Sequence, residues 1–103
     1  MSSKTFTIKD EDETKDYKFT ITDLGNKKMK FTISRDGETF TYEDSFNALK
    51  KSMRGFPQDK TTCAQALEFL EEHIGDAFVT SDEKGEVEVM FQVENGFCFT
   101  LKK

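Results

Sequence analysis

The chain has no tryptophan, one proline, one histidine and two cysteines in 103 residues, and it has no long apolar run. No segment approaches the roughly 18 apolar residues of a transmembrane helix, and the opening MSSKTFTIKD lacks the apolar core of a secretory signal. Cys63 and Cys98 are isolated from each other and from any histidine cluster, which argues against a zinc site. We therefore predict an intracellular, cytoplasmic protein with no membrane partner and with both thiols buried and reduced.

Charge is abundant but uneven along the chain. There are 20 acidic and 15 basic side chains, so the formal net charge is −5 and a phosphate backbone is an unlikely partner. Residues 68–88 hold eight acids and one lysine, whereas residues 27–60 hold eight bases and five acids. We expect an electrically two-sided molecule that binds protein and not nucleic acid.

Residues with catalytic chemistry are scarce. His73 and Cys63 are ten residues apart on a predicted helix, which is about 15 Å of rise, so they cannot touch. The acidic run of residues 10–16 lacks the glycine and glutamate positions of an EF-hand loop, and we interpret it as a solvated loop. We predict no catalytic residue, no metal and no cofactor, and hence no enzyme.

Phenylalanine is the abundant core residue, with eleven copies. Apolar side chains alternate with polar ones in several segments, and this period of two is typical of half-buried strands. Asp36-Gly37 between two such segments predicts a tight hairpin. The predicted strands cover residues 4–8, 16–22, 29–34, 39–42, 77–80, 86–93 and 97–101, with Phe19, Phe31, Phe40, Phe91 and Phe99 facing one core.

The middle of the chain changes to a helical period. Phe46, Leu49 and Met53 recur at helical spacing after a capping Asp44 or Ser45. A second helix follows from Thr62, which has capping-box spacing to Gln65, and ends at Gly75. We predict one α+β domain over residues 1–103. It is a small antiparallel β-sandwich or open barrel of about seven strands, with a helix-turn-helix inserted after the fourth strand.

Candidate partner contacts lie around this insert and at the last strand. Phe56 sits between Gly55 and Pro57 in a loop, where it either plugs the core or forms an exposed anchor. Basic side chains of the first helix can form a patch with Lys27, Lys28 and Lys30 of a hairpin, and the last strand can lie at a sheet edge. The candidate contacts are Phe56, Lys50, Lys51, Arg54 and Phe99.

The order of four strands, two helices and three strands resembles a known family of head domains. The segment FTYEDSFNALKKSMRGFPQDKTTCAQALEFLEEHI forms the insert, and the resemblance covers nearly the whole chain by element order and not by a signature motif. It is similar to the β-sandwich heads of centriolar cartwheel and DNA end-joining scaffold proteins. Those heads are non-catalytic and join one another edge to edge or through an apolar loop residue, a role that Phe56 would take here. A coiled-coil stalk normally follows, and residues 1–103 contain no heptads.

Two functions follow as expectations. The first is a non-catalytic protein–protein interaction module, a scaffold or self-associating head domain that forms a weak homodimer. The second is a small acidic inhibitor or mimic that blocks a basic site on its partner, as antitoxin-like and phage proteins do. A carrier of an apolar ligand and an unrecognised enzyme are the remaining alternatives.

Overall fold

The computed structural model describes residues 2–53, 55–93 and 96–103 of the chain. Strands make up most of it, and six of the seven are longer than the apolar alternation alone predicts, because polar residues continue the pairing; the strand predicted over residues 86–93 is shorter and ends at Phe91. The strands are β1 (Ser2–Asp10), β2 (Asp16–Gly25), β3 (Lys28–Arg35), β4 (Glu38–Ser45), β5 (Ala77–Glu83), β6 (Glu86–Phe91) and β7 (Phe97–Lys102). Two helices, α1 (Phe46–Ser52) and α2 (Cys63–Glu72), follow β4, and a 3-10 turn, η1 (Ile74–Asp76), precedes β5.

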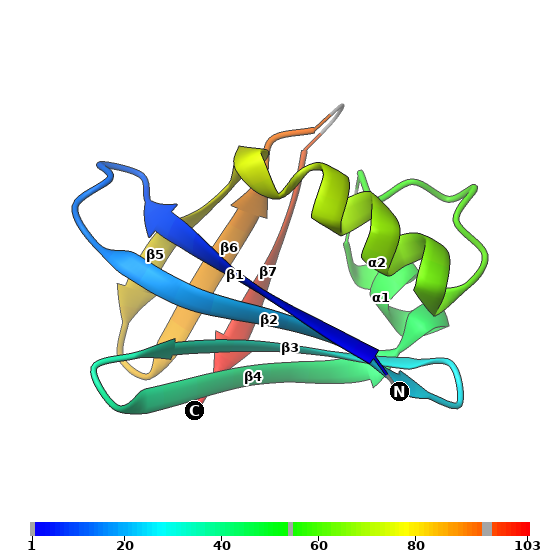
Figure 1. Ribbon diagram of the computed structural model, residues 1–103, viewed down its shortest axis with the longest axis horizontal. Coiled ribbons are helices and arrows are strands. Elements are labelled where there is room, and N and C mark those ends of the chain that lie inside the picture. The colour runs from blue at the N-terminus through cyan, green and yellow to red at the C-terminus, as the bar shows by residue number, and fades with distance from the viewer. Residues whose placement is uncertain (1, 54, 94–95) are drawn as a thin grey trace.

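The strands close into a barrel in the order β1-β2-β3-β4-β7-β6-β5 (Figure 1). The expected small, strand-rich α+β fold is confirmed, and of the two shapes left open the structure shows a barrel. The expectation that this barrel is open is wrong, because two seams close it. β4 meets β7 at the pair Thr41 and Lys102, and β1 runs parallel to β5 only at Lys9 and Asp10. Both seams are short, so the strands diverge on either side of them.

The tight turns follow the predicted chemistry. Asp36 and Gly37 have φ values of 50° and 79°, so both occupy the left-handed region that a two-residue type I′ hairpin needs. Lys84 and Gly85 repeat this between β5 and β6, with φ values of 55° and 78°. These turns set the antiparallel register of β3 with β4 and of β5 with β6.

The two helices lie together at one end of the barrel (Figure 1). Ser45 caps α1 by accepting a hydrogen bond from the Ala48 N–H at 3.2 Å, which decides between the two predicted caps. Thr62 caps α2 through the Gln65 N–H at 3.1 Å. α2 ends at Glu72, before the predicted Gly75. No helix in the described ranges is long and apolar enough to cross a bilayer.

The core is aromatic, as the sequence predicts. All five predicted core phenylalanines are buried. The ring centroids of Phe31 and Phe99 lie 4.6 Å apart, and Phe19 packs within 6.2 Å of each of them. Burial of such rings contributes about 2–3 kcal/mol each to the free energy of folding. This cluster spans β2, β3 and β7, so it joins opposite walls of the barrel.

Two further expectations need correction. Cys63 is buried, but Cys98 is exposed, because it alternates with the inward Phe97 and Phe99. β7 is not a free edge: it pairs with β6 along its length and with β4 through Lys102. Lys102, at the charged end of β7, therefore lies at the seam that closes the barrel.

Candidate interaction surface

Three apolar or sulfur-containing side chains form a row on the outside of the barrel. Phe78 of β5 is directly opposite Met90 of β6, and Met90 is directly opposite Cys98 of β7. Side chains paired in this way lie about 5 Å apart on the same face of a sheet. Phe78 and Met90 are partly exposed and Cys98 is exposed. We call these three residues the outer row.

The outer row exists because its neighbours point inward. Ala77 and Val79 are buried on either side of Phe78, and Phe97 and Phe99 are buried on either side of Cys98. Nine of the eleven phenylalanines are buried and Phe6 packs partly against the core, so Phe78 is the one left outside. The alternation of inward and outward residues in the sequence indicates that each of the three side chains points outward. That they form one row follows only from the register of the three strands.

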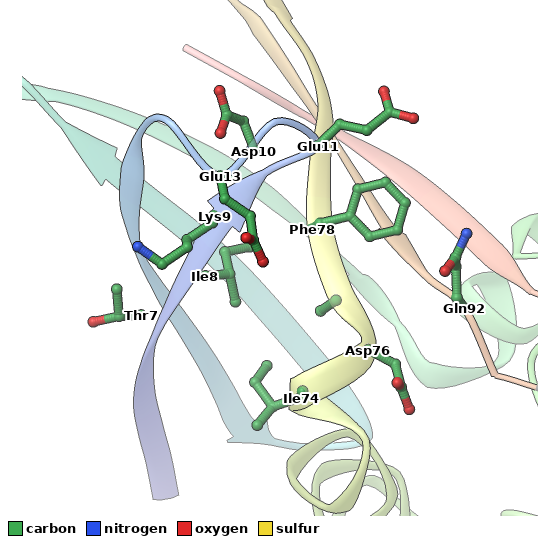
Figure 2. A pocket seen from close by; sticks show the side chains of 12 residues that line it. Thr7, Ile8, Lys9, Asp10, Glu11, Glu13, Ile74, Asp76, Phe78 and Gln92 are labelled. Carbon is green, nitrogen blue, oxygen red and sulfur yellow. The ribbon is translucent and has the colours of Figure 1, made fainter.

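A hollow of about 460 Å³ lies beside the outer row, where β1 and β5 diverge (Figure 2). Ile8 of β1 and Ile74 of η1 supply apolar side chains to it. Figure 2 shows Glu13 above Ile8 between the two strands, while Phe78 projects from β5 toward Gln92. The hollow thus connects the open side of β1 with the outer row. Its acidic lining residues are Asp10, Glu11, Glu13 and Asp76.

Two backbone hydrogen bonds determine which groups of β1 face this hollow. The Glu11 N–H donates to the Val79 carbonyl at 3.1 Å, whereas the Asp10 N–H donates to the Lys15 carbonyl at 3.3 Å on the β2 side. Successive residues of a strand present their backbone groups to opposite sides. The backbone N–H and C=O groups of the odd-numbered residues of β1 therefore point away from β2. Beyond the seam, the structure pairs Ser3, Thr5 and Thr7 with no second strand among the residues it describes.

The charges around the hollow are partly engaged. Asp10 holds its own loop, since its carboxylate accepts from the Thr14 N–H and hydroxyl at 2.6 Å each. The Thr14 hydroxyl is the main cause of a lowered pKa for Asp10. Lys9 lies 2.7 Å from Asp16, and this partner raises the pKa of Lys9. Both groups are solvent-exposed, so these contacts shape the loop and contribute little to stability.

A second polar cluster lies at the end of the barrel away from the helices. Arg35 contacts Asp82 with two nitrogens at 2.5 Å each, and the Tyr17 hydroxyl donates to the same carboxylate at 2.9 Å. The hydrogen bond from Arg35 holds the pKa of Asp82 below its usual range, and burial raises the pKa of Tyr17 to about 12. No buried side-chain nitrogen or oxygen of the described residues lacks a partner. We interpret this satisfied cluster as a structural plug of the barrel.

The predicted contact residues are distributed over several environments. Phe56 is buried and packs edge-on against Phe97 at 5.3 Å and Phe69 at 5.9 Å, so a contact through it requires the helical layer to open. Phe99 is likewise buried in the aromatic core. Arg54 lies outside the described residues. The predicted set therefore does not come together as one surface.

The predicted basic patch falls on two neighbouring elements. The Phe46 N–H at the start of α1 donates to the Lys27 carbonyl in the β2–β3 turn at 2.8 Å. Lys51 is exposed, while the Lys50 ammonium lies 5.3 Å from the centre of the Phe46 ring. Asp23 lines the same 370 Å³ hollow as Lys27, which reduces the positive charge there. The turn and the helix are adjacent, but their charge is mixed.

The residues weighed for chemistry remain apart. His73 Nδ1 lies 3.8 Å from Asp76 and its ring packs against Phe69, whereas Cys63 is buried with its sulfur 3.8 Å from the Lys28 carbonyl. Burial raises the pKa of the Cys63 thiol, which lowers its nucleophilicity at neutral pH. Within residues 2–53, 55–93 and 96–103, no three potential metal ligands gather.

Comparisons with protein-family models, with curated proteins and with solved structures give no match for this chain.

Proposed function

We propose that this chain is a non-catalytic protein–protein interaction module that binds its partner through the outer row. The observation that carries the proposal is the partial exposure of Phe78 next to Met90 on a sheet face whose other side chains are mostly polar, such as Ser81, Glu88 and Thr100. Partly exposed aromatic and methionine side chains on a rigid sheet are typical anchors of protein interfaces. The resemblance to scaffold heads favours the same function, with α1 and α2, which lie at one end of the barrel, as the helix-turn-helix insert (Figure 1).

The test compares three proteins against extract from the native host. They are the wild type, Phe78→Ser and, as a matched control on the same face, Thr100→Ala. A partner retained by the wild type and by Thr100→Ala should be lost with Phe78→Ser, and with the purified partner the affinity should fall about 30-fold or more. Equal capture by all three proteins would remove the outer row as the binding site.

Self-association is a second part of the same proposal. A weak homodimer through the outer row should show a rise in apparent mass by light scattering as concentration increases, and Phe78→Ser should abolish that rise. The net charge of −5 on each copy opposes the contact, so dimers should be more abundant at high salt.

The acidic-inhibitor function has its own supporting observation. Glu83, Glu86 and Glu88 lie together on the β5–β6 hairpin and line one hollow, in which the acids outnumber the single base, Lys84. A mimic that uses this hairpin should bind one basic protein with an affinity that falls steeply with salt. Neutralising Glu83 and Glu86 should weaken that binding, whereas Phe78→Ser should not.

A further inference from the structure

We infer that the open edge of β1 is a docking site for an extended, basic segment of a partner protein, which adds to the barrel as an eighth strand. This inference rests on the proposed function, because it names a second contact and the chemistry of the partner. Its pairing groups differ from those of the outer row, since it uses backbone groups of β1 and not side chains of β5, β6 and β7, although Phe78 also lines the hollow beside this edge.

The edge is long enough for strand addition. From Ser2 to Ile8, β1 pairs with β2 on one side, and the described residues offer it no strand on the other. The backbone hydrogen bonds of Asp10 and Glu11 show which residues of β1 point their backbone groups toward β2 and which point them away. By this alternation, the N–H and C=O groups of Ser3, Thr5 and Thr7 point away from β2. Six backbone groups in register are a template for an extended peptide.

Space for an added strand is present at the Thr7 end of this edge. The 460 Å³ hollow begins at Thr7 and Ile8 and reaches Ile74 and Gly75 on the opposite side. Toward the other end of this edge, the Lys4 ammonium bridges to Glu71 of α2 at 2.6 Å. An added strand would lie along Ser3–Thr7 and end against the β1–β5 seam, with one apolar side chain over Ile8 and Ile74.

The acidic side chains around the hollow favour a basic partner segment. Glu11, Glu13 and Asp76 line the hollow, while the nearby lysines Lys4 and Lys9 are already paired with Glu71 and Asp16. A lysine- or arginine-bearing segment is therefore attracted, and an acidic one is repelled. A second copy of this chain would bring two such acidic rims together, so a basic segment of a different protein fits better.

The test uses nitrogen-15-labelled wild-type protein and synthetic peptides as probes. The basic probe is acetyl-TKVKTKVK-amide, the acidic control is acetyl-TEVETEVE-amide, and a third peptide carries the basic sequence with N-methyl groups on its four central backbone nitrogens. In the free protein, the amides of Ser3, Thr5 and Thr7 should exchange with solvent much faster than those of Lys4, Phe6 and Ile8, which face β2. The basic peptide should slow the three odd-numbered amides about tenfold or more.

Two kinds of variant distinguish the contribution of backbone pairing to peptide binding from the contribution of charge. Thr5→Pro removes one outward donor at a position where an edge strand tolerates proline, and it should abolish binding while the urea midpoint changes little. Glu11→Gln with Glu13→Gln should weaken the basic peptide about threefold per carboxylate, and Glu83→Gln with Asp59→Asn, which change the net charge equally, should leave it unaffected.

Three outcomes would overturn the inference. They are the absence of protection of the odd-numbered amides with the basic peptide at millimolar concentration, equal binding of the N-methylated peptide, and protection that rises with protein concentration alone, which would assign the edge to a second copy. Phe78→Ser should bind the basic peptide like the wild type, so failure at the edge and failure of the outer row are distinguishable.

Discussion

Arg35 and Asp82 form a two-pronged ion pair, with Nε of the arginine 2.5 Å from Oδ2 of the aspartate, although they are 47 residues apart in the chain. Their side chains are 19% and 10% exposed, so the pair is shielded from water much more than the other ion pairs. It joins the end of β3 to β5 across the barrel. The free energy of unfolding that is lost when the pair is removed therefore measures how much it stabilises the closed barrel.

Asp82→Asn should destabilise the fold by about 2–3 kcal/mol, measured as a lower urea midpoint at pH 7. The substitution leaves a largely buried guanidinium whose remaining ion pair among the described residues is the longer contact with Glu38, at 3.7 Å. Glu83→Gln, an exposed change on the same strand, should shift the midpoint by less than about 0.5 kcal/mol and is the control. Similar midpoints for both variants would show that the ion pair does not hold the barrel.

The same variant predicts a pH dependence. Because Arg35 lowers the pKa of Asp82 in the folded state, the stabilisation is complete above the unfolded pKa of about 4 and is lost as pH falls through the lower folded value. The difference in unfolding free energy between wild type and Asp82→Asn should be constant from pH 7 to 5 and shrink below about pH 4. A difference that persists unchanged to pH 2 would contradict this assignment.

The raised pKa of Tyr17 predicts that the fold loses stability at alkaline pH. Burial raises its pKa to about 12, above the unfolded value of about 10, so its contribution is complete below pH 10 and is lost as pH rises through 12. In a Tyr42→Phe background, Tyr17 is the sole tyrosine, and its phenolate absorbance should rise only near pH 12 or on unfolding. Ionisation near pH 10 in the folded protein would show that the hydroxyl is not enclosed.

Truncation of two phenylalanines, one buried and one partly exposed, should cost very different amounts of stability. Phe31→Ala removes a ring that is 1% exposed and packs on Phe99, and it should cost about 3–5 kcal/mol in urea unfolding. Phe78→Ala should cost less than about 1 kcal/mol, because its ring lies partly in solvent. If both variants are equally destabilised, Phe78 belongs to the core and the outer row loses its anchor.

The two thiols should differ in reactivity. Cys98 is exposed and should react with a maleimide at neutral pH within the mixing time of an ordinary labelling experiment, followed by mass spectrometry. Cys63 is buried, and its raised pKa leaves little thiolate, so it should react only at the rate at which α2 opens. Cys98→Ser should show almost no early adduct. Equal early labelling of both cysteines would contradict the arrangement of α2 over the barrel.

Much of the fold was predictable because local chemistry decides it. Alternating apolar residues placed Phe19, Phe31 and Phe40 on one face, and Asp36-Gly37 required a tight hairpin whatever the rest of the chain did. The end of the last strand was harder to predict. An apolar-faced strand with terminal lysines has the same sequence pattern at an edge and at a seam, and only the pairing of Lys102 with Thr41 distinguishes the two.

The candidate surface was not predictable in the same way. Outward positions at Met90 and Cys98 follow from the inward Val89 and Phe99, but their alignment with Phe78 depends on the register of three strands. The open edge of β1 depends on its parallel contact with β5, which is nearly 70 residues away in sequence. No local pattern specifies where two such strands meet and where they separate.

The sequence by itself determined the elements and their buried faces, because periodicity, caps and turns act over a few residues. Tertiary structure decided which polar and apolar groups meet. A bulge between Val79 and Ser81 shifts the alternation of β5 by one residue, so Asp82 pairs with the inward Val87 and reaches Arg35 inside the barrel. The local sequence around Phe56 is compatible with a buried ring and with an exposed anchor. The ring is buried because it packs against Phe97 and Phe69, which removes its apolar surface from water.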